Sequence, residues 1–599
     1  MQNGERRQMG PNTNTAGNAK NKKFAWKEFK HSIKPYAFPI IISVLLAVGS
    51  AMLALFIPKI LGDMTNIAVS SYPDIDWGQI SGKAILVIGL FVGAAILNYA
   101  QAFILAVVSA NYTKDLRNAV IEKIQRMPIS YFDKHKYGDT LSRMTNDIDV
   151  LTTSMSQEIA DVSLSLTTLI GVMVMMILIS VPLSLVSFVV VPISVLVVGK
   201  ITNFAQKYFR EQQATLGVLN GKIEEDYAGH IIIKSNSYEK EATFSFDETN
   251  NKLAKAATKA QVFSSLSFPA THVFTNLGYI AVCVLGGMFV IEGKVTIGSI
   301  QAFIQYVSRF NRPITEIAST TATIQALLAA SERIFEFLSE AEEEPDPEPS
   351  ITLDEVKGEV EFHDVCFEYL PGVPVIRDFS VKVAPGTNVA IVGPTGAGKT
   401  TIINLLMRFY EPTSGYITVD GEPIKAMKRS DVRAMFGMVL QDTWLFSGTV
   451  EENLKYGKKD ATLDEIKAAA KASNVEHIIE ALPHGYKTMI SEDSDNISAG
   501  EKQLLTIARA MTANPPMMIL DEATSNVDTR TEQLIQDSLE KLTDGRTSFV
   551  IAHRLSTIRN SDLILVMRDG KIVESGTHNE LLKLNGFYAE LYNSQFAEN

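Results

Sequence analysis

The stretch Ala390-Ile391-Val392-Gly393-Pro394-Thr395-Gly396-Ala397-Gly398-Lys399-Thr400-Thr401-Ile402 decides the fold of the second half of this chain. Its apolar start is typical of a buried strand, and its glycines with Lys399-Thr400 have the spacing of a phosphate-binding loop that opens a helix. Bare backbone N–H groups in such a loop face a polyphosphate, and the helix N-terminus adds its positive end. We therefore expect Gly393 to Thr401 to bind a nucleotide, with Lys399 on the outer phosphates and Thr400 on Mg²⁺.

The bulk composition predicts membrane spans. A chain of 599 residues is too long for one domain. A mean hydropathy of +0.09 with 20% charged residues is unusual for a soluble enzyme of this size. The formal charge of −12 argues against a nucleic-acid partner. With only two cysteines, Cys283 and Cys366, neither a disulfide framework nor a zinc cluster is expected.

Uncharged runs in the first half predict six membrane helices. A bilayer core needs about 20 apolar residues, and the runs lie at 37–57, 84–113, 162–199 and 262–291, with a sixth beginning at 295. The third run is long enough for two helices joined by a tight turn near Pro182. The last run meets Arg309 and Arg312 before full length, so hydropathy alone does not establish the sixth span. These arginines would line a water-filled vestibule or the inner interface, or would snorkel.

Lysines and arginines set the expected topology. They crowd the N-terminus and the segments 114–143 and 200–259, which predicts that these parts face the cytoplasm. We expect a multi-pass protein of the plasma membrane, disordered over 1–23. From Phe24 a basic, aromatic segment follows, which either lies on an anionic bilayer surface or is a solvated charge run.

The predicted fold class is multi-domain, with an all-α membrane domain at 24–340 and an α/β nucleotide-binding domain at 358–599. An acidic, proline-rich linker at 341–357 separates them, because its like charges repel and its prolines oppose a helix. Beyond it, short apolar strands alternate with amphipathic helices.

A pair of acids follows a second buried strand. The run Met517 to Leu520 ends in Asp521-Glu522. At the nucleotide, Asp521 would hold Mg²⁺ directly or through water, and Glu522 would orient and polarise the attacking water. The alternative is an ordinary surface pair at a strand end, which the preceding phosphate-binding loop makes less plausible.

With these motifs, the chain from about Phe24 to Glu590 resembles a half-transporter of the ATP-binding cassette (ABC) exporters. Tyr369 matches the aromatic residue that stacks on adenine, Gln441 the Q-loop, 525–528 the D-loop and His553 the switch histidine. The resemblance implies that Gln441 senses Mg²⁺ and the attacking water and that His553 bonds the γ-phosphate. The segments 131–149 and 224–234 resemble the coupling regions that dock on the nucleotide domain.

The signature segment departs from the family pattern Leu-Ser-Gly-Gly-Gln, since this chain reads Ile497-Ser498-Ala499-Gly500-Glu501. Ser498 and Gly500 keep the hydroxyl and backbone donors that would clasp the γ-phosphate of ATP held by another subunit. Glu501 would weaken that clasp by like-charge repulsion. The resemblance thus implies a second half-transporter as partner, and an intact Glu522 beside an altered signature favours a heterodimer over a homodimer with a tolerant signature.

The few charges inside the spans predict an apolar or amphipathic cargo rather than small ions. Polar residues of the spans would face the cavity or bond between helices; these are Asn98, Gln101, Gln301, Gln305 and Tyr306. The function we predict is ATP-driven export of hydrophobic compounds, a multidrug efflux subunit. A lipid or peptide exporter of the same architecture is the alternative.

Overall fold

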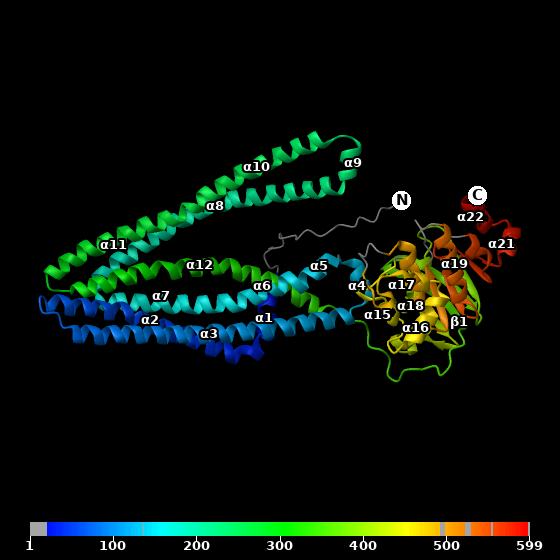
Figure 1. The fold of residues 1–599 in the computed structure, drawn as a ribbon, viewed down its shortest axis with the longest axis horizontal. Coiled ribbons are helices and arrows are strands. Elements are labelled where there is room, and N and C mark those ends of the chain that lie inside the picture. The colour runs from blue at the N-terminus through cyan, green and yellow to red at the C-terminus, as the bar shows by residue number, and fades with distance from the viewer. Residues whose placement is uncertain are drawn as a thin grey trace. The chain divides into compact units, whose positions relative to one another are not determined.

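The computed structural model describes residues 21–135, 137–441, 443–491, 497–521, 529–552 and 555–596. The chain divides into two compact units (Figure 1). One comprises Met1–Arg126 and His135–Ala341, and the other comprises Met127–Lys134 and Glu342–Asn599. A short piece of the first half, which contains α4 (Ile129–Lys134), therefore belongs to the second unit.

All of the secondary structure described in the first unit is helical. Its helices are α1 (Lys22–Ser32), α2 (Ala37–Ser70), α3 (Trp77–Arg126), α5 (Tyr137–Ser142), α6 (Ile148–Thr153), α7 (Ile159–Ile179), α8 (Val181–Ala228), α9 (His230–Ser235), α10 (Glu239–Ser265), α11 (Ser267–Ile291) and α12 (Ile297–Ser339). A 3₁₀ turn at Lys34–Tyr36 and π-helical segments at Arg143–Asp147 and Ser154–Glu158 connect some of them. Lys22 and Lys23, which we predicted to be disordered, lie in α1 because the side chain of Asn21 caps that helix by accepting from the Phe24 N–H at 3.1 Å.

Five helical stretches among the described residues are long and apolar enough to cross a membrane, namely Lys34–Ser70, Trp77–Arg126, Thr140–Ile179, Val181–Ala228 and Glu239–Ile291. The first five predicted spans lie inside them. The third and fourth separate at Ser180, whose extended backbone precedes Pro182 in the first turn of α8, as predicted. The sixth predicted span falls in α12, a continuous helix that is not among the five, so it stays a prediction.

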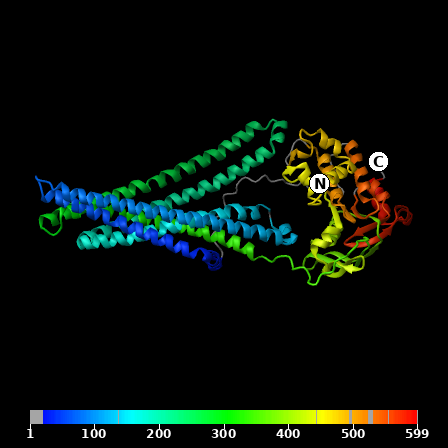
Figure 2. The ribbon, with the colours of Figure 1, turned by 60° about the horizontal axis from the view of Figure 1, so that its bottom comes forward.

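Two helices are far longer than a bilayer requires. α3 has 50 residues and α8 has 48, which at about 1.5 Å per residue gives lengths of about 70–75 Å. The hydrocarbon core is only about 30 Å thick. α8 packs along α10 and α11, and the short helix α9 connects α8 to α10 (Figures 1 and 2). α3 and α8 therefore continue well beyond a membrane.

Pro58 lies inside α2, where this helix contacts α12. Pro58 lacks an N–H, so the Ala54 carbonyl has no helical partner. Arg309 of α12 donates to this carbonyl at 3.1 Å, and the hydroxyl of the buried Tyr306 donates to the Leu55 carbonyl at 2.6 Å. Arg309 therefore bonds α12 to α2. We expected it to line a vestibule or the inner interface, or to snorkel, and neither expectation included this bond.

Two of the polar residues predicted for the spans bond between helices, and a place at the cavity stays a prediction for the others. Gln301 accepts from the Thr65 hydroxyl across α2 and α12, and Tyr306 bonds α2 as described, so both connect helices. Gln101 is buried, Gln305 is half-buried and Asn98 is exposed in the single chain.

The second unit has the predicted α/β architecture, with one mainly parallel sheet and one antiparallel sheet. The larger sheet has the order β12-β11-β3-β10-β9-β6, in which only β12 is antiparallel to its neighbour. Its strands are β3 (Asn388–Val392), β6 (Phe436–Val439), β9 (Met517–Asp521), β10 (Thr547–Ile551), β11 (Leu563–Arg568) and β12 (Lys571–Gly576). The apolar runs of the five parallel strands are almost fully buried, as expected where helices cover both faces, whereas the edge strand β12 alternates exposed and half-buried residues.

The antiparallel sheet has the order β2-β1-β4-β5 and packs on the helix that follows β3. Its strands are β1 (Val360–Leu370), β2 (Val373–Val383), β4 (Ser414–Val419) and β5 (Glu422–Pro423), and a small separate pair is β7 (Gly448–Thr449) with β8 (Met489–Ile490). The helices of this unit are α13 (Lys399–Leu406), α14 (Arg429–Met435), α15 (Val450–Lys455), α16 (Leu463–Ala472), α17 (Glu476–Ala481), α18 (Ala499–Ala513), α19 (Thr529–Thr543), α20 (Leu555–Arg559), α21 (His578–Leu584) and α22 (Phe587–Phe596). Short 3₁₀ turns lie at Ile424–Ala426 and Gly485–Lys487.

Candidate nucleotide site

The predicted phosphate-binding loop connects β3 to α13 in the second unit. Gly396 and Gly398 have φ values of 84° and 101°, which glycine adopts without strain. A Cβ at Gly398 would also lie 2.6 Å from the end of the Ile376 side chain, which would have to shift. Pro394, Thr395 and Gly396 are exposed, and the residue at the N-terminus of α13 makes no side-chain cap. The first N–H groups of α13 are therefore free to bind an anion.

Lys399 lies over this loop. It is the first residue of α13, is only 8% exposed, and donates from Nζ to the carbonyls of Gly393 at 2.8 Å and Pro394 at 3.1 Å. Burial lowers the pKa of its amine, and the nearby Asp521 carboxylate opposes this shift. A bound polyphosphate would favour the charged amine far more strongly than two carbonyls do.

Strand register brings the predicted residues to one edge of the sheet. Ile551 of β10 is paired with Ile391 of β3 on one side and with Asp521 of β9 on the other. Val439 of β6 is paired with Leu520 of β9, so Gln441, two residues further on, follows β6 at the same edge as Asp521. Because carboxyl ends of parallel strands share an edge, the loop after β3 lies there as well.

Tyr369, the predicted adenine-stacking residue, is hydrogen-bonded to α13. Its hydroxyl donates to the Thr401 hydroxyl at 3.2 Å and accepts from the Asn404 amide at 3.3 Å. Its half-buried ring meets the rings of Phe367 and Tyr410 edge to face, with centroids 4.8 and 5.0 Å away. Sequence reasoning missed Asn404, although its position one turn after Thr400 on α13 indicates a residue close to the loop.

Family comparisons agree with this geometry. Residues 40–314 match the model of the ABC transporter transmembrane region, and residues 376–525 match the model named ABC transporter. This chain is an ABC transporter. It is 48% identical to a fatty acid ABC transporter ATP-binding/permease protein of Mycobacterium bovis, over 86% of this chain and 82% of the relative.

Two further relatives have other names. A putative multidrug export ATP-binding/permease protein of Bacillus subtilis is 33% identical over 95% of this chain and 99% of the relative. An ATP-dependent lipid A-core flippase of Syntrophus aciditrophicus is 34% identical over 86% of this chain and 85% of the relative. The transporter is thus a half-transporter of the exporter type, a multi-pass membrane protein whose cytoplasmic domain binds and hydrolyses ATP to drive transport.

The signature segment of the transporter forms a capping box at the start of α18. The Ser498 hydroxyl accepts from the Glu501 N–H at 3.3 Å, and the Glu501 carboxylate accepts from the Ser498 N–H at 2.7 Å. Gly500 is buried in the first turn. Glutamate and glutamine both make this motif. The departure from the family pattern therefore keeps the local backbone geometry, and the carboxylate is already bonded within its own helix.

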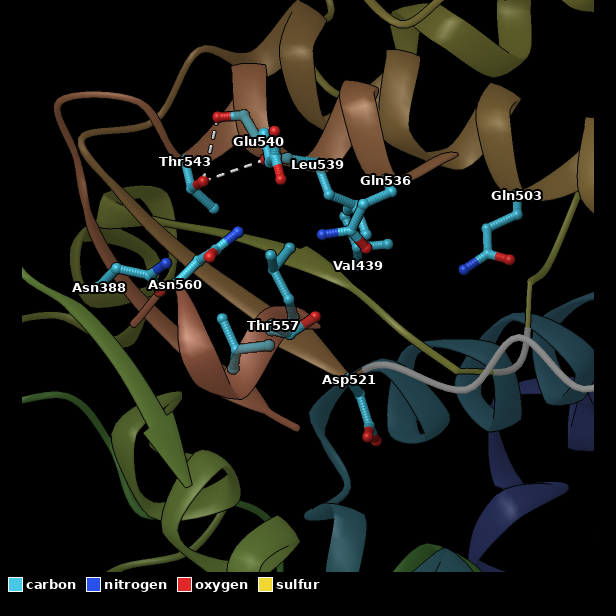
Figure 3. A pocket seen from close by; sticks show the side chains of 12 residues that line it. Asn388, Val439, Gln503, Asp521, Gln536, Leu539, Glu540, Thr543, Thr557 and Asn560 are labelled. Carbon is cyan, nitrogen blue, oxygen red and sulfur yellow. Dashed lines mark hydrogen bonds between the residues drawn. The ribbon is translucent and has the colours of Figure 1, made fainter. Parts of the chain in front are cut away.

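A cavity of about 50 Å³ lies beside Asp521, under α19 (Figure 3). Asn388, Gln503, Thr543 and Asn560 are among its lining residues. The Asp521 carboxylate points away from Thr543 in this view. Ligand pockets usually measure about 300 Å³ or more, so the cavity is too small for a nucleotide. The exposed loop at the sheet edge is the better site, and an open surface of this kind is what a second domain would have to cover.

Several predicted residues lie outside the described part of the chain. Glu522 and His553 are among them, together with the predicted D-loop at 525–528. Their roles stay predictions. Thr400 is described, and it is exposed in the first turn of α13, next to the loop.

Proposed function

We propose that this transporter exports a hydrophobic or amphipathic compound, and that its cargo is either a lipid-like molecule or a range of drug-like molecules. The observation that carries this proposal is the composition of the five candidate spans, whose most apolar windows have mean hydropathies of 1.9 to 2.8. Such helices offer little to bind a small hydrated ion. The fatty acid relative at 48% identity and the lipid flippase at 34% support the lipid class, and the multidrug relative at 33% supports the drug class.

ATP hydrolysis measured in lipid nanodiscs can separate these classes. The probes are oleic acid, a phospholipid series, a hydrophobic cationic dye and an apolar peptide. Stimulation by oleic acid or one lipid alone would refute the multidrug proposal, and stimulation by the dye alone would refute the lipid proposal. A response to none of the probes, with hydrolysis intact, would contradict the amphipathic cargo itself.

We further propose how the chain uses ATP. Thr400, Asp521 and Gln441 would hold Mg²⁺, which neutralises charge on the phosphates when bound. The exposed hydroxyl of Thr400 and the position of Asp521 at the sheet edge suit a cation that prefers oxygen ligands. Gly393, Lys399 and the first N–H groups of α13 would bind the phosphates. Glu522 would orient the attacking water, and His553 would bond the γ-phosphate.

Glu522→Gln tests the catalytic assignment. The substitution removes the base and keeps the phosphate contacts, so turnover should stop while ATP binding persists, measured with a fluorescent ATP analogue. Glu532→Gln in α19 serves as a control for an acid further along the chain. Hydrolysis at the wild-type rate in Glu522→Gln, assembled with its natural partner, would exclude Glu522 as the catalytic residue.

The partner that we propose is a different half-transporter, giving a heterodimer. The altered signature supports this proposal, whereas the capping box of Ser498 and Glu501 supports the homodimer alternative, because it keeps the helix start intact. Purifying the transporter expressed alone decides between them. Vigorous hydrolysis and transport by that preparation would refute the heterodimer.

A further inference from the structure

The turn Arg408–Glu411 directly follows the phosphate-binding helix α13 and is fixed by buried charges. Arg408 has a φ of 53° and a side chain that is only 4% exposed. Its guanidinium donates to the Glu411 carboxylate at 2.7 Å and to the Met427 carbonyl at 2.6 Å. Bonds of this kind to a buried arginine hold the backbone of the turn in one geometry. The turn is therefore held in place directly after the end of α13.

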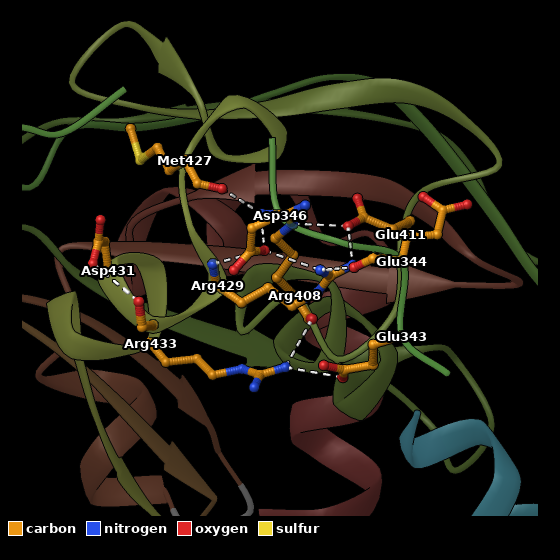
Figure 4. Close-up of polar contacts among 10 residues, drawn as sticks. Glu343, Glu344, Asp346, Arg408, Glu411, Met427, Arg429, Asp431 and Arg433 are labelled. Carbon is orange, nitrogen blue, oxygen red and sulfur yellow. Dashed lines mark hydrogen bonds and ion pairs between the residues drawn. The ribbon is translucent and has the colours of Figure 1, made fainter. Parts of the chain in front are cut away.

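The acidic linker lies on one side of this turn (Figure 4). Arg429 donates to the Glu344 carbonyl at 2.6 Å and to the Asp346 carboxylate at 3.0 Å, and Arg433 donates to Glu343 at 3.3 Å. Arg433 also donates to the Arg408 carbonyl at 3.4 Å. We predicted that the acids of this segment would repel one another. Two of these acids, Glu343 and Asp346, are instead paired with arginines, so this part of the linker is bound to the nucleotide unit.

Tyr410 connects the turn to two further elements. Its ring meets the ring of Tyr369 edge to face, at 5.0 Å and 87°. Its hydroxyl donates to the Asp133 carboxylate of α4, which belongs to the same compact unit. Burial raises the pKa of Tyr410, and so does the Asp133 carboxylate, so the hydroxyl stays protonated at neutral pH and keeps donating.

We propose that the turn Arg408–Glu411 is a coupling junction, through which Tyr410 transmits adenine binding at Tyr369 to α4 while the arginines transmit it to the linker. Tyr410 is a positioning residue, since it would touch neither the phosphates nor the cargo. Aromatic pairs hold preferred geometries, so a base stacked on Tyr369 constrains the Tyr410 ring and, through its hydroxyl, α4. The junction can shift the transporter from one conformation to another only if its contacts differ between the nucleotide-free and the nucleotide-bound protein. This inference rests on the proposed adenine role of Tyr369.

Hydrogen exchange measured on the full-length transporter, assembled with its partner, tests the junction without knowledge of the cargo. ATP with Mg²⁺ should slow exchange of the α4 amides by at least about fivefold, the low end of ordinary coupling between sites. Tyr410→Phe keeps the ring and removes the hydroxyl, and Asp133→Asn weakens the acceptor. Each variant should lose most of the slowing at α4 and keep it at residues 393–401. The double variant should lose no more than either single variant.

Matched controls separate coupling from structural damage. Tyr416→Phe changes an exposed tyrosine of β4, and should leave the slowing at α4 intact. Uridine triphosphate, whose smaller base stacks less well, should slow exchange at 393–401 in the wild type and much less at α4. Additive losses in the double variant, or unchanged slowing at α4 in both single variants, would overturn the proposal.

A separate variant distinguishes this inference from the proposed function. Tyr369→Ala should weaken ATP binding, measured with a fluorescent analogue, if Tyr369 stacks on adenine. Unchanged affinity in Tyr369→Ala would refute the adenine role itself. Intact affinity in Tyr410→Phe with unchanged slowing at α4 would refute the junction alone.

Discussion

Replacing Gly298 with alanine should force α2 and α12 apart, because the two backbones touch at this residue. A Cβ on Gly298 would collide with the Gly62 carbonyl and would lie 2.7 Å from Cγ of Asn66. Non-bonded carbon atoms pack at about 3.5 Å or more, so Asn66 would have to recede by about 0.8 Å and the Gly62 backbone would have to move as well. Asn66 also accepts from the Gly298 N–H at 2.8 Å, and this bond would be lost.

The cost follows from these contacts. Overpacking of a tight contact costs about 1–3 kcal/mol, and a hydrogen bond between membrane helices contributes about 0.6 kcal/mol. A total of about 2–3 kcal/mol corresponds to a roughly 30- to 150-fold change in an equilibrium constant. Small residues at such crossings let helix backbones approach closely, which is why neither glycine tolerates a side chain here.

Thermal unfolding of the purified transporter in detergent measures this effect, with fluorescence-detected size exclusion after heating as the readout. Gly298→Ala should lower the apparent Tm by about 4–8 °C, and Gly62→Ala should do the same, since its Cβ would collide with the Gly298 carbonyl. Gly287→Ala in α11 is the control, because a Cβ there meets nothing within 4 Å. An unchanged Tm in Gly298→Ala would show that α2 and α12 are not in contact at these glycines.

Three further predictions concern single polar groups. Arg309→Met should destabilise the helices by about 1–3 kcal/mol, because the carbonyl that Pro58 frees loses its donor, and adding Pro58→Ala should recover most of the loss in Tm by restoring an N–H. The pKa of Glu465 is lowered to about 2, and the largest cause is the hydrogen bond from Lys458. The ionised carboxylate therefore stabilises the folded state above pH about 4.5, and this stabilisation is lost as the pH falls through about 2. Glu465→Gln should therefore lower the Tm at pH 7, and the difference should disappear towards pH 2. Glu501→Gln should leave the Tm unchanged because glutamine keeps both capping-box bonds, whereas Glu501→Ala should lower it.

Local patterns predicted the parts of the fold that depend on neighbouring residues. The glycine spacing before Lys399 gave the loop between β3 and α13, and Pro182 marked the break between α7 and α8. The sequence could not predict the partner of Arg309, because this bond needs α12 to pack against a carbonyl 255 positions earlier in the chain. The pairing of Asp346 with Arg429 and of Glu343 with Arg433 could not be predicted for the same reason, since these arginines lie 83 and 90 positions away in sequence.

The candidate site shows the same division. The apolar runs before Gly393 and Asp521 are visible in the sequence, whereas Gln441 was assigned by resemblance, and only the strand pairing of the structure brings the three to one edge. The spacing of Ser498 and Glu501 is also that of a capping box, so a purely local signal could have shown that Glu501 is bonded within its helix. Tyr410 had no such signal, because its contacts come from α4 and β1, which lie at a distance along the chain.

The proposed roles divide the nucleotide contacts into two sets with different requirements. The contacts that the signature would make to the γ-phosphate come from another subunit, so they would form only in a closed dimer. The adenine side is complete within one chain, since Tyr369, Thr401 and Tyr410 all belong to the second unit, and Tyr410 already bonds α4. A nucleotide would therefore constrain α4 through its base before the dimer closes, while closure would add the partner's contacts to the γ-phosphate. Binding and closure would then act on the membrane helices in sequence, through separate contacts, and each could be lost by mutation without the other.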